Sequence, residues 1–327
     1  MRHLDNLRIL TDCQHGFRKY RSCETQLILT VDDLSRGLDN SEQIDAILLD
    51  FSKAFDKVPH HHLLYKMDFY GIRESTKQWI ASLLTGRTQC VEVEGQTFHT
   101  TPVTSGVPQG TVLGPLLFLL YINDLPEWVS RHSTVRLFAD DSLLYRKIRS
   151  SADSVQLQRD LDQLAAWERT WLMFFNPSKC QLLRITKRRS PIQLDYRLQG
   201  HVLEQVSTAK YLGLNLHERL PWNYHTDVTA KKANRIRSFV ARNVHSCPKK
   251  VKAACYTTLV RPVMEYATTV WAPRTAQNCY KLEQVQRRAA RFARCKYERT
   301  ASVTSMLNDL KWESLETRRN SQRLTMF

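Results

Sequence analysis

The sequence predicts an α+β fold, in which a part that forms a sheet is followed by a helical C-terminal part. A near-continuous apolar run over residues 44–51 is typical of a strand that is buried on both faces. Two further apolar runs within residues 135–145 flank the pair Asp140-Asp141 and predict a hairpin with the two carboxylates at its tip. From Thr226 onward, strand patterns give way to helical patterns rich in Lys and Arg.

Length and composition indicate a globular chain with a sizeable core. The chain has 327 residues, of which 42% are hydrophobic, and this exceeds one average domain. A net charge of +16 predicts a polyanionic partner, either nucleic acid or an acidic membrane surface. The most apolar run, residues 112–122, is too short to cross a bilayer and contains Gly114 and Pro115, so we expect no membrane span.

The cysteines are scattered along the chain without a CxxC pair. This spacing predicts neither a zinc site nor a disulfide framework. We expect free thiols and therefore an intracellular protein. The N-terminus has no apolar segment of the signal-peptide type, and the sequence gives no indication of the oligomeric state.

A basic segment around Gly16 precedes a predicted helix over residues 24–38. Glycine permits close approach of a backbone, and Arg18, Lys19 and Arg21 carry the charge and the donors that suit phosphate groups. A solvated surface loop explains the same residues equally well. The apolar residues of the helix recur at helical spacing on one face: Leu27, Val31, Leu34 and Leu38.

The strand predicted over residues 44–51 carries a carboxylate, Asp50, near its end. An unpaired buried carboxylate is costly, so we expect Asp50 to be protonated, paired or bound to a metal. Residues 52–59 predict a turn, and Pro59 is suited to the start of a helix that continues to Tyr70.

The segment before the Asp pair predicts a helix, a hairpin and a loop. Residues 89–95 alternate as in an edge strand, and residues 97–103 are expected to pair with them across a turn.

Residues 104–111 form a glycine-rich loop ahead of an apolar helix over residues 113–125. Such a loop offers amide groups to a phosphate or a base, although Gly and Pro also mark ordinary loops. The helix before the hairpin ends near Gly86, with a face made of Trp79, Ile80, Leu83 and Leu84.

After the Asp pair, an amphipathic helix is predicted over residues 150–175, followed by strands over 179–186 and 210–216. Gly213 marks a bulge or the close approach of another backbone. Residues 282–295 predict a helix with an apolar face and a basic face. The basic face is either solvated or a grip on a nucleic-acid backbone, and the net charge favours the grip. It consists of Arg287, Arg291 and Arg294.

Three carboxylates are expected to meet at the tips of adjacent strands: Asp50, Asp140 and Asp141. Two Mg²⁺ ions held about 3.5–4 Å apart by such a set can activate an attacking oxygen and stabilise a leaving phosphate. This chemistry suits a primer 3′-hydroxyl as nucleophile and pyrophosphate as leaving group, with Lys179 among the cations expected nearby. Ordinary turn chemistry is the alternative interpretation of the Asp pair alone.

The sequence resembles the reverse transcriptases of non-LTR (LINE-type) retrotransposons, of the jockey and chicken-repeat kind. The resemblance covers nearly the whole chain, and six motifs agree in identity, order and spacing. The motifs are Gln14-His15-Gly16-Phe17-Arg18, residues 49–56, residues 105–110, Phe138-Ala139-Asp140-Asp141, Asn176-Pro177-Ser178-Lys179 and Tyr211-Leu212-Gly213-Leu214.

The resemblance implies a right-hand polymerase with an antiparallel-sheet palm, partial fingers and a helical thumb. The partial fingers would comprise residues 1–43 and the palm, with finger insertions, residues 44–217. A basic helical thumb would follow over residues 218–300 and a C-terminal tail over 301–327. Upstream of Gln14 we expect the fingers to be cut short, and we expect neither an endonuclease nor a cysteine-rich tail within this chain.

The resemblance also implies roles for individual residues. Asp50 and Asp140 would bind both metals with help from the Phe51 carbonyl, while Asp141 would lie beside them. Lys179 would donate a proton to pyrophosphate.

Other motifs would contact the substrates. Phe55 would be the steric gate that excludes a ribose 2′-hydroxyl. Gln109 and Gly110 would position the incoming nucleotide and the template, and Arg18 would contact the phosphates of the nucleotide. The primer grip would consist of Tyr211, Leu212 and Gly213.

The function expected from these residues is RNA-directed DNA polymerisation in a LINE-type retroelement. The partners would be an RNA template, a DNA primer and dNTPs, with two Mg²⁺ ions as cofactors and no membrane, and an active retroelement enzyme would work in the nucleus. Two alternatives stay open: a truncated, catalytically weak or silent nucleic-acid-binding remnant, and a two-metal nuclease. A nuclease, however, has no use for Phe55 or the loop around Gln109.

Overall fold

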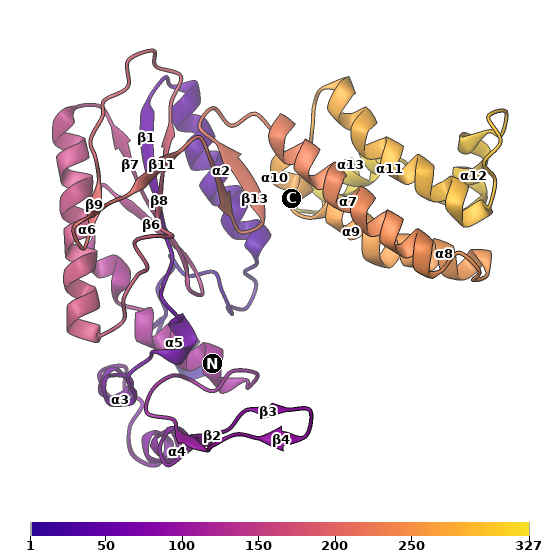
Figure 1. Cartoon of the computed structure of the whole chain (residues 1–327). Helices are drawn as coiled ribbons and strands as arrows, with labels where there is room; N and C mark the ends of the chain where they lie inside the picture. The colour runs from indigo at the N-terminus through magenta and orange to yellow at the C-terminus, as the bar shows by residue number, and fades with distance from the viewer. Residues whose placement is uncertain (1, 327) are drawn as a thin grey trace. The chain divides into compact units, whose positions relative to one another are not determined.

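The computed structural model describes residues 2–326 and divides into two compact units, Met1–Leu212 (unit 1) and Gly213–Phe327 (unit 2) (Figure 1). Unit 1 contains the helices α1 (Arg2–Asn6), α2 (Cys23–Asp39), η1 (Ala54–Asp56), α3 (His60–Phe69), α4 (Glu74–Leu84), α5 (Leu113–Ile122), η2 (Leu125–Trp128) and α6 (Ser151–Trp171). Its strands are β1 (Gln43–Leu49), β2 (Thr88–Gln89), β3 (Glu92–Val93), β4 (Gln96–Thr97), β5 (Thr101–Pro102), β6 (Thr134–Phe138), β7 (Asp141–Ile148), β8 (Gln181–Ile185), β9 (Arg197–Leu198), β10 (His201–Val202), β11 (Glu204–Val206) and β12 (Thr208–Tyr211).

A five-stranded sheet with the order β11-β8-β1-β7-β6 forms the centre of unit 1. All neighbouring strands run antiparallel except β11 and β8, which are parallel. The central strand, β1, is almost entirely buried, as its continuous apolar run predicts. The predicted α+β class with a largely antiparallel sheet is confirmed.

Side chains of the sheet alternate between two faces, and α2 and α6 flank the strands in Figure 1. Ile47 and Leu49 of β1 belong to the main hydrophobic core, together with Leu161 of α6. The intervening residues of β1 therefore point to the other face. On β7, Tyr145 lies on that face, because its hydroxyl donates a hydrogen bond to the Asp33 carboxylate of α2.

The flanking helices begin where the sequence supplies capping residues. The Ser22 hydroxyl accepts a hydrogen bond from the Thr25 amide, and the Thr25 side chain binds back to the Ser22 amide, which closes a capping box at α2. Ser150 and Asp153 form the equivalent capping box at α6. These caps fix the helix starts close to the predicted ones.

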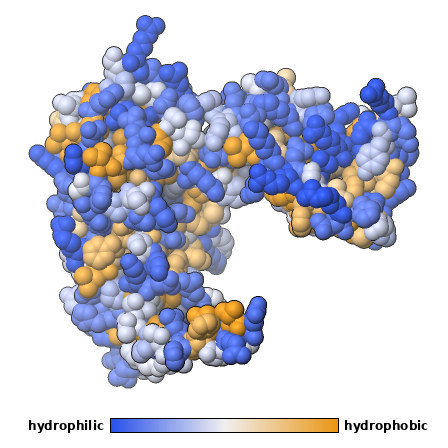
Figure 2. All heavy atoms as spheres, in the orientation of Figure 1, coloured by the Kyte–Doolittle hydropathy of each residue, from blue (hydrophilic) through white to orange (hydrophobic). Residues whose placement is uncertain are grey.

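Three predicted elements differ from the structure. The hairpin over residues 89–103 consists of short, exposed strand pieces outside the main sheet. Neither of its faces packs on a core that would hold longer strands. Its apolar side chains are exposed and contribute to an orange patch in Figure 2. Trp79 is 57% exposed instead of packed. The strand predicted over residues 210–216 is broken at Leu212 and Gly213, which both have positive φ.

Over residues 213–326, unit 2 is helical apart from one short strand, as the sequence predicts. Its elements are β13 (Leu214–His217), α7 (Asn223–Asn243), α8 (Lys249–Cys255), η3 (Tyr256–Val260), α9 (Arg261–Glu265), α10 (Thr268–Trp271), α11 (Ala276–Arg294), α12 (Val303–Asp309) and α13 (Leu315–Met326). Leu282, Val285 and Ala289 of α11 are fully buried, which confirms the predicted apolar face. Within residues 2–326, none of the helices combines the length and the apolar character of a membrane span.

Candidate active site

Asp50 directly follows the central strand, and the backbone around it is held by a neighbouring segment. The Asn176 amide donates to the Asp50 carbonyl at 2.7 Å, and the Ser52 amide donates to the Phe174 carbonyl at 2.9 Å. The Phe51 ring stacks on Phe175 with 4.2 Å between ring centroids. Because Phe51 is buried on the α6 side, its neighbour Asp50 is directed to the opposite face.

Asp140 and Asp141 occupy the tip of the hairpin formed by β6 and β7, as the sequence predicts. Phe138 pairs with Asp141, so the tight turn consists of Ala139 and Asp140. Leu49 pairs with Ser142, and continuing this register places Asp50 opposite Asp141. Asp141 lies on the same sheet face as Tyr145, since the two are separated by an even number of positions. Asp50 and Asp141 therefore share the α2 face at one end of the sheet.

The charges of these carboxylates oppose one another. Burial raises the pKa of Asp140, and the charge of Asp50 raises it further. Burial also raises the pKa of Asp141, with added contributions from Asp140 and Asp50, while Lys210 lowers it. Burial and the charge of Asp50 thus both disfavour the ionised forms of Asp140 and Asp141.

Two lysines border this acidic centre. A small cavity of about 90 Å³ is lined in part by Asp50, Asp141, Lys179 and Lys210. The Lys179 ammonium lies 3.6 Å from an Asp50 oxygen, with both side chains about half exposed. Sequence reasoning anticipated Lys179 but missed Lys210. Its place immediately before Tyr211, within the predicted primer-grip strand, is the signal that points to it.

The donors at this site suit a divalent cation. Mg²⁺ is usually bound through one or two carboxylates together with water and substrate phosphates, and seldom by a cage of protein groups alone. Among the residues that the structure describes, no three acidic, histidine or cysteine side chains are grouped to enclose an ion by themselves. The open carboxylates of Asp50, Asp140 and Asp141 therefore fit an ion that shares its ligands with a substrate.

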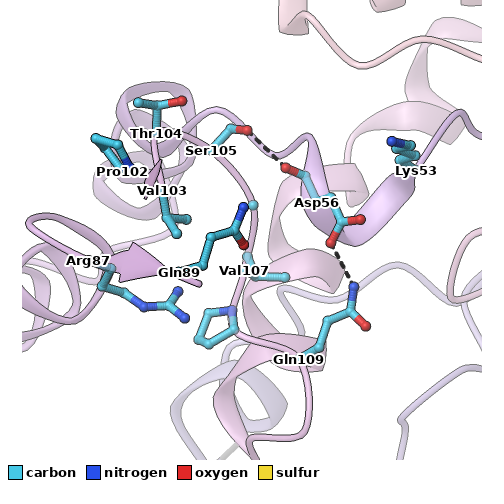
Figure 3. A pocket seen from close by; sticks show the side chains of 12 residues that line it. Lys53, Asp56, Arg87, Gln89, Pro102, Val103, Thr104, Ser105, Val107 and Gln109 are labelled. Carbon is cyan, nitrogen blue, oxygen red and sulfur yellow. Dashed lines mark hydrogen bonds between the residues drawn. The ribbon is translucent and has the colours of Figure 1, made fainter. Parts of the chain in front are cut away.

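The glycine-rich loop packs against the turn that follows Asp50 (Figure 3). Gln109 donates to the Asp56 carboxylate at 2.7 Å, and the Ser105 hydroxyl donates to the Asp56 carbonyl at 2.9 Å. Gly106 has a φ of +89°, and an added Cβ would lie 2.7 Å from the Asp56 carbonyl oxygen. Only glycine meets both conditions.

This loop also lines a sizeable cavity. The cavity has a volume of about 490 Å³ and is lined by Lys53, Arg87 and Gln109, among others (Figure 3). Gly110 is exposed with a φ of +75°, and nothing lies within 4 Å of the position of an added Cβ. The loop therefore leaves open space beside Gln109.

Phe55 lies in η1, between the Asp50 strand and the glycine-rich loop. Its ring stacks on the buried Phe118 ring at 4.4 Å and meets Phe17 edge-on at 6.4 Å. The Val107 amide donates to the Phe55 carbonyl at 2.8 Å. The ring is thus fixed by its neighbours while part of it stays accessible.

The remaining predicted site residues have mainly internal partners. The Arg18 guanidinium donates to the carbonyls of Leu10 and Thr11 at 3.2 and 2.9 Å, so this side chain holds its own segment. The Tyr211 hydroxyl accepts from Gln26 at 3.1 Å, and burial raises the pKa of Tyr211 to about 12. Leu212 and Gly213 lie at the boundary of the two units. The roles predicted for all these residues stay predictions.

A protein-family model described as "Reverse transcriptase (RNA-dependent DNA polymerase)" matches residues 1–216. The chain belongs to the reverse transcriptase family. Membership confirms the resemblance and the right-hand polymerase fold class predicted from it, and it implies a dependence on divalent metal ions. The carboxylates of this reverse transcriptase chain supply suitable oxygen donors.

Curated relatives of this reverse transcriptase chain come from LINE-type elements. The probable RNA-directed DNA polymerase from transposon BS of Drosophila melanogaster is 30% identical over 97% of this chain and 37% of its own length. The RNA-directed DNA polymerase from mobile element jockey of the same species is 28% identical over 88% of this chain and 32% of its own length. The chain therefore spans about a third of the length of these relatives.

The solved structures that match this chain include telomerases. Telomerase from Candida albicans, in complex with a TWJ fragment of telomeric RNA, has a TM-score of 0.47 and 13% identity and covers 94% of this chain and 52% of its own. The corresponding telomerase complex from Candida tropicalis has a TM-score of 0.47 and 11% identity and covers 99% of this chain and 55% of its own.

Proposed function

We propose that this chain carries out RNA-directed DNA synthesis, in which a primer 3′-hydroxyl attacks the α-phosphate of a dNTP and pyrophosphate leaves. The observation that carries this proposal is the position of Asp50, Asp140 and Asp141 together at one end of the sheet, in a chain of the reverse transcriptase family. An RNA template, a DNA primer and dNTPs are the partners we propose.

The three carboxylates would hold two Mg²⁺ ions, with the Phe51 carbonyl as a further ligand. When bound, Mg²⁺ would favour deprotonation of the primer hydroxyl and offset the negative charge of the phosphates. Burial raises the pKa of Asp140 and Asp141, and repulsion from Asp50 raises both further; this supports the assignment, because a cation at the site would remove the repulsion.

The remaining residues would bind and orient the substrates. Lys179 beside Asp50 has the charge and exposure to reach a phosphate and to protonate the departing pyrophosphate. Lys210 would add positive charge beside Asp141. Gln109, Gly110 and the nearby cavity would receive the incoming nucleotide and template, with Phe55 limiting the space at the sugar.

The direct test is primer extension by the purified full chain with Mg²⁺, dNTPs and a DNA primer annealed to RNA or to DNA. We expect extension on the RNA template, and none when Mg²⁺ is chelated. Salt-dependent binding without extension on either template would instead identify a catalytically silent nucleic-acid binder. Degradation of the template or primer without extension would identify a nuclease.

Unit 2 would supply a basic surface for the duplex, as expected for a thumb. Arg237 of α7 and Arg288 of α11 lie near each other: burial lowers the pKa of Arg237, and the charge of Arg288 lowers it further. Such neighbouring like charges are stabilised by a polyanion that binds both. The visible surface of the helices in unit 2 is largely hydrophilic (Figure 2).

Replacing Arg237 and Arg288 by Gln should weaken template–primer binding and flatten its salt dependence. For every phosphate that the variant no longer neutralises, the slope of log K against log salt concentration should fall by about 0.9. The measurement is fluorescence anisotropy of a labelled duplex at several salt concentrations. As a charge-matched control, we expect no change of slope for the double variant Arg159→Gln, Arg169→Gln, whose side chains are exposed on α6. Equal slopes for both double variants would contradict the assignment.

A further inference from the structure

The turn that presents Asp140 and Asp141 has a strained backbone. Ala139 adopts a φ of +52°, which L residues other than Asn and Asp seldom adopt. The turn is only two residues long, so a rotation of the Ala139 peptide would redirect the carboxylate that follows it. Such a conformation persists when surrounding groups hold it in place.

The side chain of Gln14 holds this peptide on both sides. Its Oε1 accepts from the Ala139 amide at 2.9 Å and from the Gly16 amide at 2.7 Å, and its Nε2 donates to the Ala139 carbonyl at 3.4 Å. Gln14 is only 2% exposed. Because water cannot replace these bonds at a buried site, their loss would leave the polar groups of the turn without partners.

The backbone around Gln14 is itself fixed to the hairpin. The Leu137 amide donates to the Cys13 carbonyl and the His15 amide donates to the Leu137 carbonyl, both at 2.9 Å. An added Cβ on Gly16 would lie 2.3 Å from the Ala139 nitrogen, so the segment lies directly against the turn. Any side chain at residue 16 would clash with the turn, so this close approach requires glycine.

We propose that Gln14 is a positioning residue, which fixes the Ala139 peptide and thereby the directions of Asp140 and Asp141. It would act through the turn, because its side-chain amide is bonded to Gly16 and Ala139. The part of this inference that concerns catalysis rests on the proposed function, whereas the part that concerns the turn does not. Its test therefore needs one readout that is independent of activity.

The chain contains a matched control for this interaction. Gln43 is fully buried, accepts from the Ile192 amide at 2.8 Å and donates to the Ile192 carbonyl at 2.8 Å and to the Asp45 carboxylate at 2.9 Å. Like Gln14, it thus binds both the amide and the carbonyl of a single residue. However, it lies at the start of β1, whereas Asp50 follows the end of that strand. Gln43→Met therefore reports the general cost of losing a buried glutamine.

The experiment compares Gln14→Met and Gln43→Met in the full chain by amide hydrogen exchange of residue 139 and by single-turnover incorporation at saturating dNTP. We expect Gln14→Met to accelerate exchange at Ala139 and to lower the single-turnover rate by about 100-fold, the scale of a 1 Å misplacement, with template–primer affinity unchanged. Gln43→Met should change neither quantity. Thermal unfolding of both variants measures the shared loss of stability.

Unchanged exchange at Ala139 in Gln14→Met, or an equal fall in rate for both variants, would overturn the proposal. Should Gln14→Met fail to fold, Gln14→Asn keeps the amide but is one methylene shorter, and the same faster exchange is expected. If the parent chain shows no extension, the proposed function fails, while the exchange result still decides whether Gln14 holds the turn.

Discussion

Asp140→Asn is expected to reduce primer extension at least about 10³-fold, which corresponds to about 4 kcal/mol of lost transition-state stabilisation. The amide keeps the shape of the carboxylate but removes the charge that we assign to cation binding. The same change should leave the fold as stable as the parent, or more stable. Burial and the charge of Asp50 raise the pKa of Asp140, so its ionised form is disfavoured in the folded chain.

This combination of lost activity and retained stability distinguishes a functional carboxylate from a structural one. The measurements are steady-state extension on a primed RNA template and thermal unfolding at neutral pH without Mg²⁺. Asp195→Asn provides the control, because Asp195 is an exposed carboxylate outside the sheet. An Asp140→Asn variant that extends the primer at the parental rate would contradict the site.

Phe55→Ala should relax discrimination against ribonucleotides without removing the carboxylate centre. Only one ring is lost, and the expected gain in relative ribonucleotide incorporation is about 10–100-fold, typical of steric selection in an apolar pocket. The ring is fixed by stacking on Phe118, so no neighbour replaces it without repacking. The measurement is single-turnover incorporation of matched dNTP and rNTP by the same enzyme preparation.

Phe55→Leu is the matched variant for this experiment, since it keeps apolar bulk at the position. It should retain most of the sugar discrimination. Both variants should incorporate deoxynucleotides at a rate close to that of the parent. If the ratio of the two incorporation rates is the same for the parent and for Phe55→Ala, then Phe55 is not the gate.

The sheet and its carboxylates could be predicted because their signals are local. The continuous apolar run of β1 and the paired runs around Asp140 determine which residues are buried, and antiparallel pairing then brings the chain segments to one end. For the hairpin over residues 89–103, the sequence predicts more regular structure than the chain adopts. Its alternation is real, but it packs on no core that would hold long strands in register.

The support of the site could not be predicted in this way. Gln14 and Ala139 are separated by 125 residues, and no periodicity links a glutamine side chain to a particular peptide group. Lys210 likewise reaches the neighbourhood of Asp141 only through the folded path of the chain. Leu212 interrupts a plausible strand because its φ is positive, which its side chain does not foretell.

The pairing of Cys13 and His15 with Leu137 should also affect how the chain behaves in concentrated solution. β6 is the last strand of the main sheet, and its outer rim carries unpaired amide and carbonyl groups. The N-terminal segment occupies part of that rim at Leu137. We expect this cover to hinder the addition of a strand from another molecule at this edge, so the same few residues that brace the acidic turn should also reduce self-association there.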